Sequence, residues 1–155
     1  MKREILFRAW DKVEGKYFEP IYEAYKGNLL DLSISLNGRI LRRTIELPAE
    51  DESCFQDRYI LEQFTGLTDK NGVKIFEGDV FKYAEHSGYL LRSFTAVVSY
   101  KDYVASFAYL KCGLDENGWE QPLIHFFNES DEFEEDILPH IEVIGNIHDN
   151  SSDLS

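Results

Sequence analysis

The clearest pattern in the chain is a strict alternation of apolar and polar residues at positions 30–36. One side of the strand that this alternation predicts carries Leu30, Leu32, Ile34 and Leu36. Asn37-Gly38 follows, a pair that accepts the positive φ angles of a two-residue type I′ turn. Residues 39–47 then continue as a second apolar-rich segment, with Leu41, Ile45 and Leu47 in phase. The pattern predicts an antiparallel hairpin of residues 30–36 and 39–47, with Leu32 and Ile34 buried.

Short apolar runs separated by turn-forming residues recur along the rest of the chain. They predict strands at 59–64, 73–76, 80–83, 94–100, 104–110, 123–127 and 141–147. Short strands leave exposed edges unless the sheet curls on itself. We therefore expect residues 73–111 to form a small barrel of five or so strands, closed by residues 141–147. Its core is predicted to contain Ile75, Val97, Phe107 and Ile144.

The net charge argues against one class of function, the binding of nucleic acids. The chain has 16 basic and 29 acidic side chains, which gives a formal charge of −13. A phosphate backbone would meet net repulsion, so direct nucleic-acid binding is not expected. No apolar run approaches the roughly 20 residues of a membrane span, so we expect no membrane contact and a cytoplasmic protein. A chain of 155 residues with 43% hydrophobic content supports one core and one domain.

The negative charge is concentrated near the C-terminus. Residues 1–111 contain all 16 basic residues and 17 acidic ones, so the remaining −12 lies in residues 112–155. Within that segment an acidic run comprises Glu129, Asp131, Glu132, Glu134, Glu135 and Asp136. Like charges this close repel one another unless they are solvated or meet a basic partner. The run is therefore predicted to be a loop or a frayed helix and is a candidate partner-binding site, although a loop that only maintains solubility is the simpler interpretation.

Candidate catalytic and metal-binding residues are few. Cys54 and Cys112 match no metal or redox spacing, so we expect reduced, partly buried thiols. The histidines, which are His86, His125, His140 and His148, form no ligand pair. No glycine-rich phosphate-binding loop precedes a helix. We therefore predict no catalytic residues, no metal site and no cofactor.

A turn at residues 69–72, Asp-Lys-Asn-Gly, resembles a cation-binding loop only superficially. Asp69, Asn71, Glu77 and Asp79 could converge on one rim, but the segment lacks the alternating oxygen ligands and the terminal glutamate of a calcium loop. Asp69 and Asn71 are expected to bond their own backbone in the turn. Gly66, Gly72, Gly78 and Gly145 lie where a turn, a bulge or a close backbone approach is predicted.

Three segments together resemble the YopX family of phage and prophage proteins. They are Phe7-Arg8-Ala9-Trp10-Asp11, residues 64–80 (FTGLTDKNGVKIFEGDV) and residues 142–147 (EVIGNI). The resemblance implies a phage or prophage origin, a mainly β fold with a small barrel of the Src homology 3-like kind, and a molecular function that is unassigned. It brings no catalytic residues. His148 stands where the family commonly has an aromatic residue after the last segment.

These observations define one YopX-like domain and three functional hypotheses. The domain would place N-terminal strands and a hairpin extension in residues 1–56, the barrel in 57–148 and a tail in 149–155. The favoured hypothesis is a protein-interaction or self-assembling module in the bacterial host cytoplasm, with the amphipathic hairpin as its contact surface. Its partner would be another protein or a second copy. The alternatives are an acidic nucleic-acid mimic that inhibits a host DNA-binding protein, and an enzyme of unrecognised type.

Overall fold

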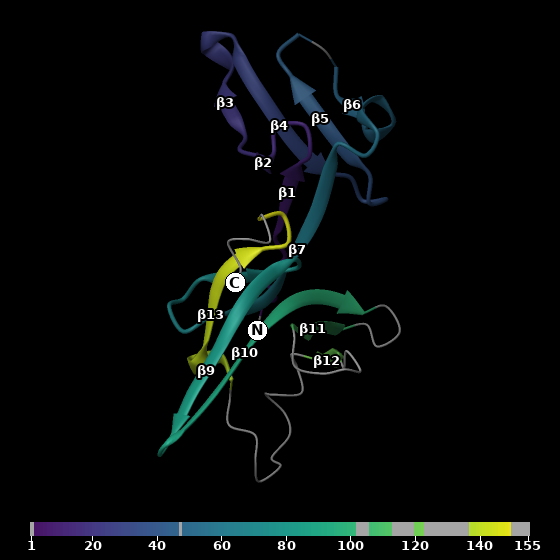
Figure 1. The fold of residues 1–155 in the computed structure, drawn as a ribbon. Helices are drawn as coiled ribbons and strands as arrows, with labels where there is room; N and C mark the ends of the chain where they lie inside the picture. Colours follow the sequence, from purple (N-terminus) through teal and green to yellow (C-terminus); the bar gives the residue numbers. More distant parts are fainter. Residues whose placement is uncertain (1, 47, 102–105, 113–119, 123–136, 150–155) are drawn as a thin grey trace. The chain divides into compact units, whose positions relative to one another are not determined.

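Strands are the main secondary structure of the residues that the structure describes. The computed structural model describes residues 1–155 except 1, 47, 102–105, 113–119, 123–136 and 150–155. The strands are β1 (Phe7–Asp11), β2 (Lys16–Tyr17), β3 (Ile21–Glu23), β4 (Asn28–Ile34), β5 (Ile40–Thr44), β6 (Glu50–Asp51), β7 (Tyr59–Thr68), β8 (Lys74–Phe76), β9 (Asp79–Ser87), β10 (Leu90–Lys101), β11 (Ser106–Cys112), β12 (Glu120–Pro122) and β13 (Ile141–Asn146). Short 3₁₀ turns are η1 (Ala24–Lys26), η2 (Glu52–Phe55) and η4 (Leu138–His140). The expected mainly β fold is confirmed, and the sheets curl like half a barrel (Figure 1).

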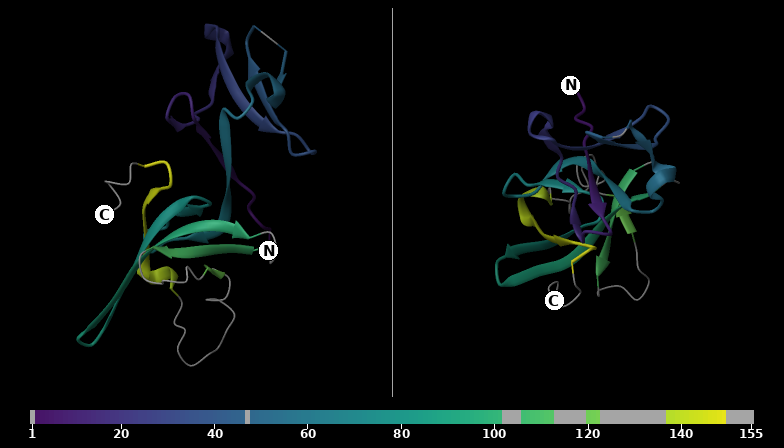
Figure 2. Two further views of the ribbon diagram at one scale, coloured as in Figure 1. Left: turned by 45° about the vertical axis from the view of Figure 1, so that its right-hand side comes forward. Right: turned by 90° about the horizontal axis from the view of Figure 1, so that it is seen from above.

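The described residues group into two compact units. The N-terminal unit is Phe7–Leu61, and the main unit combines Met1–Leu6 with Glu62–Ser155. The N-terminal unit contains the sheet β3-β4-β5-β6 together with β1, β2 and the beginning of β7. The main unit contains the end of β7, its partner β8, and a five-stranded sheet in the order β12-β11-β10-β9-β13 (Figure 2).

The predicted hairpin is present in the N-terminal unit, but its turn is longer than expected. β4 and β5 pair antiparallel with Ile34 opposite Ile40. The Gly38 N–H donates to the Ser35 carbonyl, the Ser35 N–H donates to the Arg39 carbonyl, and Gly38 has a φ of 81°. This is a three-residue turn that ends in a left-handed glycine rather than a two-residue type I′ turn.

This turn shifts the strand register by one residue, which changes the buried face of β5. A one-residue shift moves every side chain of a strand to the opposite face. Ile40 is 8% exposed, whereas Leu41, on the opposite face, pairs with Ser33. Leu32 is half-buried and Ile34 is 38% exposed, so the prediction that both are buried was wrong for Ile34 and only partly met for Leu32.

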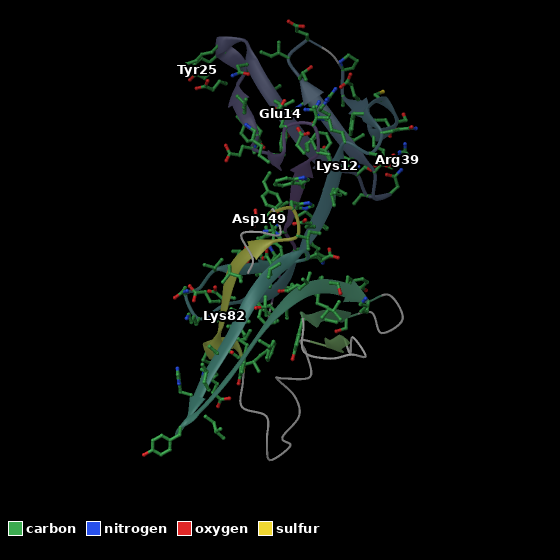
Figure 3. The ribbon with its side chains drawn as sticks, viewed as in Figure 1. Lys12, Glu14, Tyr25, Arg39, Lys82 and Asp149 are labelled. Carbon is green, nitrogen blue, oxygen red and sulfur yellow. The ribbon has the colours of Figure 1, made fainter. Side chains whose placement is uncertain are left out.

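The N-terminal unit has a very small core. Its buried apolar residues are Ala9, Ile40 and Tyr59, and Phe18, Leu32, Phe55 and Leu61 pack around them. Phe18 and Phe55 both meet the Tyr59 ring edge to face, with centroids 6.0 and 5.5 Å away. Aromatic contacts of this kind supply much of the burial in so small a core. Tyr25, labelled in Figure 3, is 81% exposed and adds nothing to it.

The main unit has the larger core, on the concave face of its five-stranded sheet. Buried members include Ile75, Phe81, Ala96, Val98, Tyr109 and Ile141. Phe94 stacks on both Tyr83 and Tyr109, with centroids 4.8 and 5.9 Å away. β13 pairs antiparallel with β9, so the expected return of residues 141–147 to the sheet is confirmed. The predicted strand at 73–76 is β8, which pairs with β7 in another sheet.

Two of the four predicted core residues of the barrel are buried. Ile75 and Phe107 are 0% and 6% exposed, but Val97 is only half-buried and Ile144 is 43% exposed. Along β13 the side chains alternate, with Ile141 and Val143 directed to the core, so Ile144 lies on the opposite face. A bulge between Val143 and Gly145 follows, at one of the glycines for which it was expected. The strand predicted at 123–127 lies outside the described residues.

β9 and β10 continue together beyond the rest of the sheet. β13 accompanies β9 only as far as Tyr83, and β11 accompanies β10 only from Thr95 onward. Lys82, labelled in Figure 3, still has a strand on each side. Residues 84–87 and 90–93 pair only with each other among the described strands. We call this two-stranded extension, residues 84–93, the arm, and both Figure 1 and Figure 2 show it projecting from the sheet.

The burial pattern of β13 predicts unequal effects of two isoleucine substitutions. Ile141→Ala removes side-chain atoms that are fully buried, which should lower the free energy of unfolding by about 2–5 kcal/mol. Ile144→Ala removes a side chain that is 43% exposed and should cost less than about 1 kcal/mol. Denaturant unfolding followed by circular dichroism measures both. Equal losses in the two variants would contradict this orientation of β13.

Candidate functional site

The turn at residues 69–72 is densely hydrogen-bonded within the main unit. One carboxylate oxygen of Asp69 accepts hydrogen bonds from the N–H groups of Asn71 and Val73, at 2.8 and 2.9 Å. The other accepts from the N–H of Val143 in β13, at 3.0 Å. The Lys70 N–H donates to the Ile141 carbonyl, 3.0 Å away. The expected bonding of Asp69 to its own turn is confirmed, and the same side chain also holds β13.

The charged form of Asp69 is stabilised although the residue is 6% exposed. Burial alone raises the pKa of a carboxyl group. Hydrogen bonds from the N–H groups of Val143, Val73 and Asn71 outweigh that effect, and the pKa of Asp69 lies below its ordinary value. All of these donors are backbone groups of the same unit. Asp69 is therefore fully engaged in structure rather than available to a ligand.

The other acidic residues of this segment also bond the backbone. Asp79, 2% exposed, accepts a hydrogen bond from the Phe76 N–H at 2.8 Å, and Glu77 accepts one from the Gln63 N–H at 2.8 Å. Asn71 is exposed. In the described part of the chain, no group of three or more His, Cys, Asp or Glu side chains is placed to hold a metal ion.

Gly78 allows a close contact between the start of β7 and the end of the chain. Its φ is 78°, and a Cβ at this position would lie 3.0 Å from Glu62 Oε1 and 3.3 Å from Ile147 Cδ1. Glu62 Oε1 is itself 2.6 Å from Nε2 of His148, and the two side chains are 4% and 10% exposed. His148, the departure from the expected aromatic residue, thus forms a polar contact that anchors the end of the described chain.

A polar hollow of about 400 Å³ lies in the N-terminal unit, beside η2. Its two guanidinium groups are already engaged: Arg58 bonds both oxygens of Asp11, with a shortest distance of 2.8 Å, and Arg39 (Figure 3) pairs with Asp51 and Glu52. The bonded guanidinium of Arg58 lowers the pKa of Asp11 against the opposing effect of burial. Internal ion pairs therefore occupy the charged groups of this hollow.

A second, apolar hollow lies against the small core of the same unit. It measures about 200 Å³, and its apolar lining includes Phe7, Phe18, Leu32, Ile34, Ile40 and Leu61. We call it the apolar groove. At its polar margin Tyr22 donates a hydrogen bond to Asp31 at 2.9 Å, which raises the pKa of the tyrosine. The groove combines exposed apolar surface with a defined polar border.

Sequence reasoning predicted a contact surface on the hairpin of residues 30–47 and did not anticipate the apolar groove, to which other segments also contribute. Phe7, Phe18 and Leu61 come from segments far apart in the chain and complete the groove lining. Residues 7–11 gave only a weak local indication of an amphipathic strand, because Trp10 breaks the alternation that Phe7, Arg8 and Ala9 begin. Long-range pairing of β1 with its neighbours, which no local pattern specifies, brings Phe7 to the groove.

The remaining candidates do not form a site in the described residues. His86 is exposed, and His140 packs its ring 6.0 Å from Tyr83. Cys54 is exposed, so the expectation of a partly buried thiol was wrong for this residue. Cys54 belongs to the 3₁₀ turn η2, which has no buried residues and lies beside the polar hollow.

Two other candidates, the acidic run at 129–136 and His125, lie outside the described residues. No described helix has the length and apolar composition needed to cross a bilayer.

Comparison with known proteins identifies the family. A family model described as YopX protein matches residues 6–155, nearly the whole chain. The chain belongs to the YopX family. The crystal structure of protein EF1440 from Enterococcus faecalis is similar, with 25% sequence identity, a TM-score of 0.48 and 95% of each chain covered. No curated protein matches the sequence.

Within this YopX chain, the segment that carried the resemblance serves the architecture. Residues 64–80 contain the Asp69 turn, the Asp79 bond and Gly78, and residues 142–147 supply the strand that Asp69 holds. In this chain, the signature segments therefore attach β13 to the main sheet.

Replacing Asp69 tests this interpretation of the signature. Asp69→Asn places an amide NH₂ or a less charged acceptor against the Val143 N–H, and should lower the free energy of unfolding by about 1–3 kcal/mol. Because the pKa of Asp69 is lower in the folded state, its contribution is complete above about pH 4 and is lost as pH falls through the folded pKa. The difference between parent and variant should therefore shrink in acid.

Thermal unfolding between pH 7 and pH 2 measures this difference. Asp57→Asn is the matched control, because Asp57 is exposed and has a φ of 58°, a conformation that asparagine tolerates. The control should unfold like the parent at every pH. A stability gap for Asp69→Asn that is constant over the whole range would contradict the role of its charge.

Proposed function

We propose that this YopX protein is a phage- or prophage-encoded protein-interaction module that binds an apolar side chain of a partner protein in the apolar groove. The single observation that supports this most strongly is the groove itself, an apolar hollow with a polar border in the N-terminal unit. The phage or prophage context is inferred from the resemblance of its three signature segments.

The size of the groove favours a protein side chain over a small-molecule ligand. Ligand pockets typically measure about 300–1,000 Å³, whereas the groove measures about 200 Å³. A volume of this size suits one or two apolar side chains. The larger polar hollow has the volume for a ligand, but its arginines are held by Asp11, Asp51 and Glu52.

The small core of the N-terminal unit supports the same proposal. A unit of residues 7–61 in which three of the described apolar side chains are buried has little hydrophobic stabilisation of its own. Phe7 is 45% exposed and Ile34 is 38% exposed at the groove. A partner that covers these side chains adds burial at about 25 cal/mol per Å² of apolar surface. Binding would therefore also stabilise this unit.

A charge placed in the groove tests the proposal. Ile34→Glu puts a carboxylate on the partly exposed groove wall, where an apolar partner side chain would desolvate it. Leu36→Glu is the matched control, on the same hairpin but 110% exposed at the turn. Both variants and the parent are used as bait in extracts of bacteria carrying the induced phage or prophage, and captured proteins are quantified by mass spectrometry.

We expect a captured protein that is lost with Ile34→Glu and retained with Leu36→Glu. Calorimetry with that purified protein should then show affinity reduced at least about tenfold by Ile34→Glu alone. Equal binding by the parent and both variants would exclude the groove as the interaction surface.

A further inference from the structure

The arm of the main unit leaves both of its outer edges open among the described strands. Its four residue pairs run from Ala84 opposite Ser93 to Ser87 opposite Leu90. The neighbouring strands β13 and β11 end their pairing before this point. Each outer edge therefore presents a row of backbone N–H and C=O groups of the kind that pairs with another strand. A two-stranded ribbon alone is marginally stable in water.

The tip of the arm is apolar and largely exposed. Tyr89, Leu90 and Leu91 are 109%, 67% and 58% exposed. Gly88, with a φ of 61°, forms the two-residue turn together with Tyr89. Three consecutive exposed apolar side chains at the end of a projecting ribbon have no role in the core of the main unit. Such a patch is typical of a contact surface.

Electrostatics indicates which molecule the arm contacts. The whole chain has a charge of −13, so two copies carry a net repulsion for one another. Residues 84–93 contain one acidic residue, Glu85, and one basic residue, Arg92, which are opposite each other in the register. The arm is therefore neutral, and two arms can approach without like-charge repulsion. Antiparallel edges are also complementary to their own copies.

We propose that the arm is a self-association element, in which the arms of two copies of this chain pair edge to edge and their Tyr89, Leu90 and Leu91 side chains pack together. The contact extends both ribbons into a wider sheet and removes their apolar tips from water. This site is separate from the apolar groove, since the arm belongs to the main unit and the groove to the N-terminal unit.

Sedimentation velocity of the full chain over a concentration series tests the proposal. The arm variant is Leu90→Ser with Leu91→Ser, two exposed positions whose change leaves the core intact. Leu36→Ser, at an exposed leucine of the N-terminal unit, is the matched control. The parent and the control should dimerise, and the arm variant should show an association constant at least about tenfold lower.

The salt dependence of the dimer separates this contact from one made by acidic surfaces. Added salt screens the repulsion between two chains of charge −13, so association through neutral arms should strengthen as ionic strength rises. A parent that remains monomeric at about 1 mM would overturn the proposal. A dimer that weakens with salt, or that is unaffected by the arm variant, would also overturn it.

A cross-linking measurement places the contact independently of affinity. Tyr89→Cys, in a chain whose Cys54 and Cys112 are changed to serine, is treated with a short bismaleimide, and Leu36→Cys in the same background is the control. Circular dichroism confirms that both proteins are folded. We expect covalent dimers with Tyr89→Cys and few with Leu36→Cys. Equal cross-linking of the two would contradict pairing of the arms.

Discussion

The carboxylate of Asp69 joins two parts of the chain that are 74 residues apart. It closes its own turn through Asn71 and Val73 and accepts the N–H of Val143. The bond from Lys70 to the Ile141 carbonyl lies beside it. These contacts fix β13, and β13 covers one edge of β9 and brings Ile141 into the core. The concave core of the main unit therefore depends on one buried charge with backbone donors around it.

Three other buried acidic residues are likewise held by groups of their own unit. Asp79, Glu62 and Asp11 are each less than 5% exposed, and each is held by an N–H, a histidine or a guanidinium of its own unit. A buried carboxylate without such partners would cost several kcal/mol. These side chains are consequently committed to folding. In this chain, the buried acidic residues that the structure describes therefore belong to the framework of the fold.

Local sequence patterns predicted the positions of the strands better than they predicted which face of each strand is buried. Alternation located β4, and Asn37-Gly38 located the turn, but a three-residue turn moved Ile40 rather than Leu41 into the core. In β13, a run of apolar residues gave no indication that Ile144 faces outward. Periodicity specifies that a strand has two faces, whereas turn geometry and distant partners decide which face is buried.

The contact surfaces were harder to predict than the strands for a related reason. The groove needs Phe7, Phe18 and Leu61 from separate strands, so only the folded unit shows it. The arm is visible only once β13 and β11 are seen to end before residues 84–93. In the sequence, Leu90 and Leu91 look like ordinary strand residues, and nothing indicates that they are exposed.

The net charge limits which surfaces of this protein can contact another protein. A chain of charge −13 approaches another copy, or another acidic protein, most easily through surfaces that carry little charge. The groove lining is mainly apolar, and the arm has one acid opposite one base. Both surfaces therefore combine accessible apolar side chains with a low local charge. Burying them removes apolar area from water without bringing unpaired carboxylates together, so two copies of an acidic chain can meet there without a large electrostatic cost.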